Sequence, residues 1–282
     1  VIAGVSQWDM PFADMIAYTI NTEGQGARCT HDGMDAYGFP WCAFGRAPDV
    51  ESMENEFPML VPFSQHWPDS GGHGKHRGGC GTAQFWAAHH VPMVYFMSIA
   101  DNSSIQTPQP LFGGYAPPTV PGLSIKGTKV TELMAKIEGG KLDFAAMVAG
   151  DFGEVTTEPF GRTTRPITGD ETIAILMSTG GAGYGDPLDR NPAAVQIDIQ
   201  KGLCSDWSAR EIYRVSWDAE RQRVDVEDTA RLRAEAKAER LRRGVPFAEF
   251  EAAWLKRRPP EEILGLYGRW PDAVPLHPAF RP

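Results

Sequence analysis

One stretch of the sequence gathers residues that can do chemistry, "DSGGHGKHRGGCG" at residues 69–81. It combines two histidines, a cysteine and two basic side chains with six glycines. Three kinds of structure use such residues: a phosphate-binding loop, a zinc site and a tight piece of backbone. The spacing of the residues helps to choose among them.

The phosphate-loop interpretation fails on spacing. A Walker-type loop requires G-x-x-x-x-G-K followed by Ser or Thr, between a strand and a helix. Here Gly74 and Lys75 are followed by His76, and further glycines stand where a helix should begin. The spacing therefore argues against ATP binding at this loop.

The zinc interpretation lacks a ligand. His73, His76 and Cys80 would supply three, whereas structural zinc takes four; only the fold could bring in another histidine. We therefore favour a backbone motif, because glycine permits positive φ and close approach of two chains. Asp69 and Ser70 are expected to bond local amide groups. The candidate motif residues, for structure or for binding an anion, are Asp69, Ser70, Gly71, Gly72, Gly74, Arg77, Gly78, Gly79 and Gly81.

A second glycine cluster, "STGGAGYGDPLDRNP" at 178–192, lies between a predicted strand and a predicted helix. It could present amide groups to an anion at the start of that helix. It lacks the spacing of a dinucleotide fingerprint, so a plain connection is favoured over a ligand loop. The candidate ligand-loop residues are Gly180, Gly181, Gly183, Gly185 and Asp186.

A third set, Cys29, His31, Asp32 and Asp35, lies within "ARCTHDGMD" at residues 27–35. These residue types could form a catalytic group, but Asp-Gly favours a turn, so a solvated turn is predicted. The sequence contains no G-x-S-x-G nucleophile elbow. No catalytic residue is therefore predicted.

Composition limits the classes of partner. The net charge of −9 is spread along 282 residues and gives no sign of a continuous basic surface, so no nucleic-acid partner is predicted. No apolar run approaches the roughly 20 residues that cross a bilayer, so no membrane partner is predicted. Four widely spaced cysteines do not make a disulfide framework and indicate a reducing cytoplasm.

The first part of the chain is rich in glycine and proline, and residues 1–185 are predicted to form a β-rich body. The apolar runs 92–100 and 172–180 read as buried strands. Residues 107–122 should form an ordered loop packed by Leu111, Phe112 and Tyr115. Residues 127–141 carry apolar positions at helical spacing and predict a short helix.

The composition changes near residue 186, and residues 186–282 are predicted to form a mainly helical tail. Asn191 and Ser205 can each cap a helix, residues 214–226 suggest a hairpin, and 226–244 and 246–258 suggest helices. The fold class is therefore α+β, a β-rich body followed by a helical tail. With so few apolar positions, the tail is expected to dock on the body or on a partner subunit.

The two glycine stretches together resemble the hydantoinase B/oxoprolinase family. Residues 69–81 are similar to its D-S-G-G-x-G-x-x-R-G-G-x-G pattern, and residues 180–192 to its G-G-x-G-x-G-D-P-x-x-R-x-P pattern. His73 and His76 occupy variable positions of that pattern, so they are only weak metal candidates. "GVSQW", "YFMSIADNS" and "LFGGYAPPT" resemble the large, alpha-type subunit of ATP-dependent acetone and acetophenone carboxylases, over its C-terminal part only.

The resemblance implies a multisubunit cytoplasmic enzyme that joins bicarbonate to a ketone and gives a β-keto acid. A hydantoinase A-like partner would bind ATP with Mg²⁺, and a small third subunit is implied. Ligands for a divalent metal such as Mn or Zn are expected outside this chain. The family's large subunit is longer, so this chain is expected to be a split gene product or a fragment, and another polypeptide would carry the N-terminal part. The alternatives are an ATP-dependent hydantoinase or 5-oxoprolinase, and a non-catalytic assembly module.

Overall fold

The computed structural model describes residues 1–15, 20–38, 45, 48–99, 106–120, 122–127, 129–136, 150–158, 162–168 and 172–257. The chain divides into two compact units, Val1–Arg233 and Ala234–Pro282. The boundary predicted near residue 186 lies inside the first unit. Strands predominate before that residue and helices after it, which confirms the α+β class.

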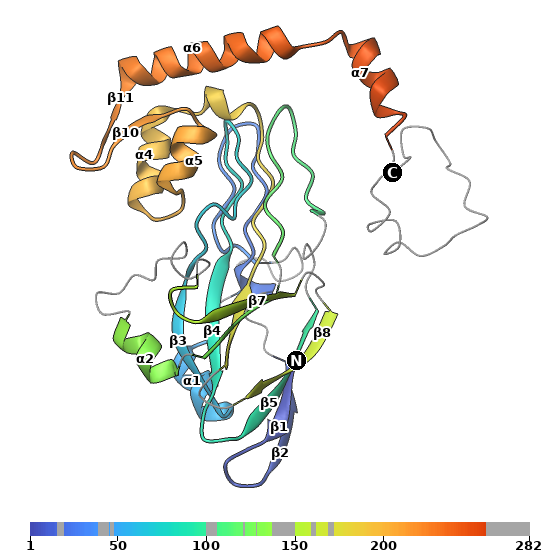
Figure 1. Ribbon diagram of the computed structural model, residues 1–282, viewed down its shortest axis with the longest axis vertical. Coiled ribbons are helices and arrows are strands. Elements are labelled where there is room, and N and C mark those ends of the chain that lie inside the picture. Colours follow the sequence, from blue (N-terminus) through green and yellow to red (C-terminus); the bar gives the residue numbers. More distant parts are fainter. Residues whose placement is uncertain are drawn as a thin grey trace. The chain divides into compact units, whose positions relative to one another are not determined.

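The first unit contains two antiparallel sheets (Figure 1). The four-stranded sheet, called sheet A here, has the order β2 (Pro11–Asp14), β1 (Ile2–Val5), β5 (Met93–Ile99) and β8 (Arg162–Thr168). The five-stranded sheet B has the order β3 (Met59–His66), β4 (Thr82–Ala88), β9 (Thr172–Met177), β6 (Gly122–Lys126) and β7 (Glu154–Glu158). The strands predicted at 92–100 and 172–180 are confirmed as β5 and β9.

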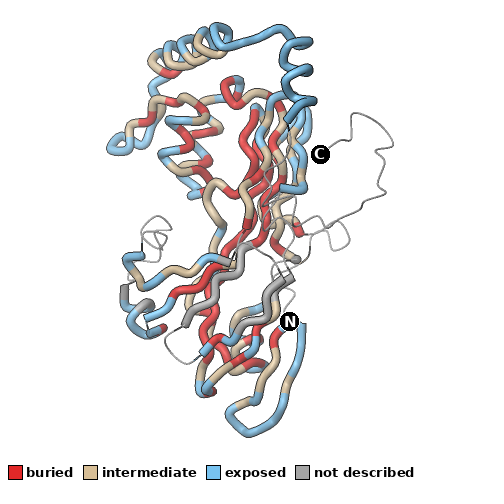
Figure 2. The backbone as a smooth tube through the Cα atoms, turned by 45° about the vertical axis from the view of Figure 1, so that its right-hand side comes forward, coloured by how far each residue is buried: buried red, intermediate tan, exposed pale blue. Residues whose placement is uncertain are grey.

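Every residue of strand β4 is buried (Figure 2). Since alternate side chains of a strand point to opposite sides, both faces of β4 are covered. Trp86 enters a core shared with sheet A and with helix α1 (Val50–Glu56). Phe85 enters a second core against β6 and helix α2 (Val130–Lys136). The predicted helix in 127–141 is thus confirmed over α2, where Val130 is buried; residues 137–141 lie outside the described residues.

Beyond these strands the chain continues as extended segments that lie side by side without forming a regular sheet (Figure 1). We call them the glycine bundle: residues 23–38, 69–81, 111–116 and 178–185. Backbone hydrogen bonds join them, for example from Gly79 N to Gln25 O at 2.7 Å and from Gly72 N to Gly181 O at 2.8 Å. The two glycine motifs of the sequence are therefore neighbours in space.

Close contact between backbones requires glycine in the bundle. A Cβ added to Gly78 would lie 1.9 Å from Gly181 O, and one added to Gly183 would lie 2.1 Å from His73 O. Among the ten glycines of the two motifs, only Gly185 has a left-handed backbone, with φ 75°. Close approach is therefore confirmed as the reason for the glycines of the first motif, and positive φ is wrong for them. In the second stretch Gly180, Gly181 and Gly183 are also required by close approach, whereas Gly185 is favoured by its positive φ.

The loop at residues 106–120 is held by its backbone and by two ring contacts. Leu111, Phe112 and Tyr115 are 56%, 76% and 42% exposed, so they do not enter a core. The Phe112 ring contacts Tyr184 with centroids 5.1 Å apart, and the Tyr115 ring contacts His73 with centroids 6.3 Å apart, so the predicted packing holds in part. Tyr115 N instead donates to His73 O at 2.7 Å, and Tyr115 O accepts from Gly183 N at 2.9 Å. The backbone thus places this loop in the bundle.

The helices and the hairpin at the end of the first unit form where the local sequence predicts them. Asn191 caps α4 (Pro192–Gln200) and Ser205 caps α5 (Asp206–Glu211), as predicted. The hairpin β10 (Ser216–Asp218) and β11 (Arg223–Asp225) and the helix α6 (Val226–Arg243) are also confirmed. A core of Val195, Cys204, Ala209, Tyr213 and Val215 holds these elements together. The short η1 (Ile20–Thr22) and η4 (Pro187–Asp189) complete the unit.

The second unit contains the end of α6 and the helix α7 (Phe247–Trp254), which confirms the helix predicted at 246–258. Phe250 and Trp254 stack with ring centroids 5.9 Å apart, and no residue of α7 is buried. The docking of this tail stays a prediction. Among the described residues, no helix has the length and apolar character needed to span a bilayer.

Candidate functional site

The glycine bundle brings together charged side chains that are far apart in the sequence. Two buried arginines, Arg77 and Arg190, meet three aspartates, Asp32, Asp35 and Asp198. We call this group the arginine–aspartate cluster. The side chains of Arg77, Arg190 and Asp198 are at most 6% exposed, and Arg77 belongs to the predicted motif.

Arg190 forms the stronger half of the cluster. Its two terminal nitrogens bind Asp32 in a bidentate pair, at 2.7 Å to Oδ1 and 2.6 Å to Oδ2. Nη2 also donates to Asp198 Oδ2 at 2.7 Å. The short helix η4, capped by the Asp186 side chain on Leu188 N, places Arg190 just before α4. Asp186 thus acts here as a helix cap.

Arg77 forms the other half. Its Nη1 donates to Asp35 Oδ1 at 2.7 Å, and its Nη2 lies 3.3 Å from Asp198 Oδ1. Asp198, on α4, therefore bridges the two guanidinium groups. This carboxylate connects the first glycine motif to the segment that follows the second one.

The aspartates at 32 and 35 also hold the backbone of the glycine motif. Asp32 Oδ1 accepts from Arg77 N, and Asp35 Oδ1 accepts from Cys80 N, both at 2.7 Å. The prediction of a solvated turn at residues 27–35 is therefore wrong for these two residues. Cys29 and His31 of the same turn are exposed, and the structure places neither in the cluster.

The cluster keeps its charges. Burial acts to raise the pKa of Asp32, but the hydrogen bonds and positive charge of Arg190 outweigh it and hold that pKa below the ordinary value. Burial acts to lower the pKa of Arg77, yet its charged neighbours, Asp198 and Asp35 among them, raise it. Two positive charges thus face three negative ones in the folded protein.

The three residues proposed as zinc ligands, His73, His76 and Cys80, lie in other environments. His73 Nδ1 lies 3.0 Å from the Tyr213 hydroxyl, and burial lowers the pKa of this histidine. His76 Nδ1 lies 3.9 Å from Asp32 Oδ1. Burial raises the pKa of the Cys80 thiol. Within the described residues no group of three or more His, Cys, Asp or Glu side chains is arranged to hold a metal ion, so these residues do not fit zinc.

The amide groups of the first motif do not fit a phosphate either. Those of Gly72, Gly78 and Gly79 donate to carbonyl oxygens of the bundle, and that of Gly81 donates to Ser70 Oγ. An anion would have to displace these bonds. This geometry favours a structural role for the motif over a ligand cradle.

The second glycine stretch has the same limitation. The amides of Gly181, Gly183 and Gly185 donate to backbone oxygens of Gly79, Tyr115 and Leu111. Gly180 leaves no room for a side chain, since an added Cβ would lie 1.9 Å from Ser70 O. The structure thus gives the ligand-loop hypothesis no geometric support.

Asp69 and Ser70 begin the first motif and act over different ranges. Ser70 Oγ donates to Trp67 O at 2.6 Å and accepts from Gly81 N at 2.9 Å, so its local bond is to a carbonyl and the amide that it binds lies at the other end of the motif. Asp69 instead accepts from Ser205 N at 3.1 Å, across 136 positions of sequence, so the local role predicted for it is wrong. Asp69 therefore joins the motif to the start of α5.

Sequence reasoning missed Arg190, Asp198, Tyr213 and Arg233. Arg233 donates to the backbone oxygens of Arg190 and Tyr213, and Tyr213 packs below the Arg190 guanidinium. Asp198 could have been found, because it lies three residues after the buried Val195 on the same face of α4. A carboxylate on a buried face needs a cationic partner.

The cluster can position backbone but is poorly suited to acid–base chemistry. Its three carboxylates are all engaged in ion pairs with arginines, and the lowered pKa of Asp32 weakens that carboxylate as a proton acceptor. None of the nearby thiol, hydroxyl and imidazole groups forms a nucleophile with its base among the described residues. The arrangement is therefore a rigid junction within the first unit.

The family of this chain follows from comparison with known proteins. Residues 2–187 match the model of the hydantoinase B/oxoprolinase family. The chain belongs to this family. The matched region contains the first glycine motif, the four glycines of the second and the residues Asp32 and Asp35, whereas Arg190, at the end of the second motif, and Asp198 lie just beyond it.

Relatives within the family include carboxylase subunits. The whole chain aligns with 42% of the length of the acetophenone carboxylase delta subunit of Aromatoleum aromaticum, and the aligned residues are 57% identical. Over 90% of its length it is 31% identical to the acetone carboxylase alpha subunit of Xanthobacter autotrophicus, covering 33% of that protein.

Solved structures share the fold. The structure of nucleotide-free acetone carboxylase matches this chain with a TM-score of 0.77 and 27% sequence identity. The match covers 90% of this chain and 34% of the acetone carboxylase chain. The ATP-dependent caprolactamase of Pseudomonas jessenii has a TM-score of 0.63 and 25% identity over 83% of this chain and 36% of that one. The chain thus spans less than half the length of each of these relatives.

Proposed function

We propose that this chain is part of the large, hydantoinase B-like subunit of an ATP-dependent ketone carboxylase. The observation that carries the proposal is the 57% identity to an acetophenone carboxylase subunit, which extends over the entire chain. An acetone carboxylase of known structure shares the fold over 90% of it. In the proposed reaction, bicarbonate and a ketone give a β-keto acid.

In this proposal the chain provides rigid support rather than reacting groups. Joining an activated carboxyl carbon to an enolate requires fixed positions and exclusion of water. A bundle in which backbones touch, locked by a buried ionic cluster, suits that demand because it leaves little freedom to move. We assign no reacting group to the described residues.

The proposed partners supply what the described residues do not. A hydantoinase A-like subunit would bind ATP with Mg²⁺, and another polypeptide would carry the rest of the large subunit. A small third subunit belongs to the same proposal. The ligands of a divalent metal such as Mn or Zn would lie outside this chain. We place the assembly in the cytoplasm, since Cys29, Cys80 and Cys204 are free thiols.

The test is an assay of the purified assembly with labelled bicarbonate. We expect label to enter the product only when ATP and a ketone are both present, and acetophenone and acetone should be compared as substrates. Omitting ATP or the ketone is the internal control. An assembly that consumes ATP without fixing bicarbonate would overturn the proposal.

A lactam hydrolase is the second candidate, because a caprolactamase shares the fold over 83% of the chain. The same preparation should then open caprolactam, a hydantoin or 5-oxoproline without bicarbonate. A third candidate is a non-catalytic assembly module, favoured by the absence of a catalytic group among the described residues. In that case a catalytic assembly would keep some activity when this chain is left out.

A further inference from the structure

Sheet A is buried on one face only. Ile2, Val94, Phe96 and Ile167 point inward and are between 0% and 4% exposed. They form one core with Trp86 of sheet B. This inner face accounts for one of the two sets of alternating side chains in sheet A.

On strands β1, β2 and β5 the opposite set of side chains forms an apolar surface, which we call the outer face of sheet A. The register places Ala3 between Ala13 and Tyr95, and Val5 opposite Pro11. Val5 and Tyr95 are 49% and 48% exposed. Along β1, β2 and β5 the register places no charged residue on this face up to Met97; its members are Ala3, Val5, Pro11, Ala13, Met93, Tyr95 and Met97. The edge strand β8 is more polar there, because the register places Thr168, Pro166 and Thr164 opposite Met93, Tyr95 and Met97, and Arg162 at the end of the strand.

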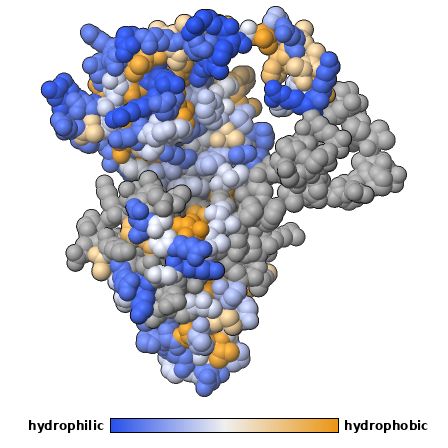
Figure 3. All heavy atoms as spheres, in the orientation of Figure 1, coloured by the Kyte–Doolittle hydropathy of each residue, from blue (hydrophilic) through white to orange (hydrophobic). Residues whose placement is uncertain are grey.

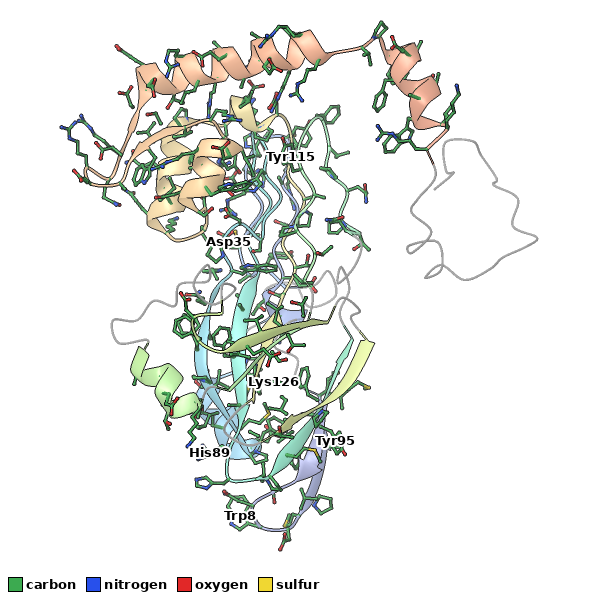
Figure 4. The ribbon with its side chains drawn as sticks, viewed as in Figure 1. Trp8, Asp35, His89, Tyr95, Tyr115 and Lys126 are labelled. Carbon is green, nitrogen blue, oxygen red and sulfur yellow. The ribbon has the colours of Figure 1, made fainter. Side chains whose placement is uncertain are left out.

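The hairpin that joins β1 and β2 extends this apolar surface. Trp8 and Met10 in its turn are 71% and 64% exposed, and Met15 after β2 is 62% exposed. Figure 4 shows Trp8 at the tip of this hairpin and Tyr95 on the neighbouring strand β5. The space-filling view also shows hydrophobic residues at the β1–β2 end of the sheet (Figure 3).

A sheet that is apolar on both faces is normally covered on both. An antiparallel sheet with one face in water carries polar side chains there, whereas a buried sheet does not. Large exposed apolar surfaces mark interaction sites. An exposed tryptophan beside such a face is typical of residues that dominate binding energy.

We propose that the outer face of sheet A, with Trp8, is the docking surface for the polypeptide that carries the remainder of the hydantoinase B-like fold. This inference rests on the proposed function. The carboxylase relatives contain this chain's fold within 42% and 33% of their length, so more than half of each lies outside it. The apolar side chains that β1, β2 and β5 present on this face suit a permanent neighbour of this kind, because lasting interfaces resemble a protein core.

The first test places the photo-cross-linker p-benzoylphenylalanine at Tyr95 in the full assembly, with peptide mass spectrometry as the readout. We expect cross-links to peptides of the polypeptide that carries the remaining hydantoinase B-like sequence. The control position is Met134 on α2, which is 52% exposed and lies on another element. Cross-links from Tyr95 to a second copy of this chain or to the ATP-binding subunit, or none in an intact assembly, would overturn the inference.

The second test measures affinity between this chain and that polypeptide by titration. We expect Val5→Glu to weaken binding about 100-fold, because an unpaired charge would be buried at the interface. Val5→Ile and Met134→Glu should leave the affinity unchanged. A thermal melt of each variant shows whether it folds, and equal affinities for folded Val5→Glu and Val5→Ile would overturn the inference.

Neither readout needs turnover, so the two proposals can fail separately. An assembly that opens a lactam and fixes no bicarbonate would end the carboxylase proposal and leave the docking surface intact. A ketone carboxylase whose Tyr95 position cross-links elsewhere would end the docking surface alone.

Discussion

Asp198 is the residue whose replacement tests the arginine–aspartate cluster most directly. Its side chain is 6% exposed and contacts Arg190 at 2.7 Å and Arg77 at 3.3 Å. Asp198→Asn keeps the size of the side chain and removes its charge. The new amide NH₂ would face a guanidinium group, and two donors cannot bond to each other.

The expected loss can be estimated from the contacts. Opposite charges about 4 Å apart attract by about 4 kcal/mol at an effective dielectric constant of about 20. Removing one partner of a buried pair costs roughly 3–5 kcal/mol. Each arginine keeps a second carboxylate, Asp32 or Asp35, so we expect a loss near the lower end, about 3 kcal/mol. For a unit of this size that is a fall in Tm of about 6–12 °C.

The measurement is thermal or urea unfolding of the purified chain, followed by circular dichroism. The matched control is Glu211→Gln, which removes the carboxylate of an exposed pair with Arg214 at 3.1 Å. The control should change the free energy of unfolding by no more than about 0.5 kcal/mol. If Asp198→Asn and Glu211→Gln destabilise the protein equally, the reasoning about the cluster is refuted.

Three further outcomes are expected. Gly78→Ala should destabilise the chain by about 3 kcal/mol or more in urea unfolding, because its Cβ would lie 1.9 Å from a backbone oxygen. Gly26→Ala should stay within about 1 kcal/mol of the parent, since nothing lies within 4 Å of that Cβ. Burial lowers the pKa of His73 from its ordinary 6.5, so below pH 6.5 the unfolded state binds more protons than the folded state. The free energy of unfolding should therefore fall as the pH drops below 6.5. His73→Gln should remove that fall, as measured by thermal melts at a series of pH values. Truncation after Gly244 should leave the Tm of the first unit unchanged within about 1 °C, because α7 buries no residue, and should weaken the assembly in native mass spectrometry.

Each of these has a contradicting result. Equal stability of Gly78→Ala and Gly26→Ala would mean that the backbone around Gly78 can shift to accommodate a Cβ. A His73→Gln variant with the parent's pH profile would assign the acid sensitivity to another group. The facing charges near His73 are Asp69, Arg77, Arg190 and Asp198, so each would be replaced in turn. An unchanged assembly after truncation would remove the docking role of the tail.

The helices at the end of the first unit were predictable because their signals are local. Asn191 and Ser205 bond amide groups two and three residues away, and both caps were read from the sequence. The hairpin at β10 and β11 and the long helix α6 likewise depend on neighbours in sequence. Local chemistry decided these elements before any packing occurred.

The family pattern was also readable, but its physical meaning was not. The ten glycines of the two motifs identified the family, yet the space at Gly78 is fixed by Gly181, more than a hundred residues later. The turn at 27–35 has an ordinary Asp-Gly sequence. Its two aspartates, Asp32 and Asp35, form ion pairs only because the fold places Arg190 and Arg77 beside them.

The sequence by itself determined the α+β class, the helix caps, the membership of a family with two glycine motifs and the absence of a phosphate-loop pattern. Tertiary structure alone decided that the glycines bring backbones together, that Asp32, Asp35 and Asp198 neutralise two buried arginines, and that sheet A leaves an apolar face exposed. The reason is physical. Caps and turns depend on bonds within a few residues, whereas close packing and charge burial depend on segments that only the fold brings together.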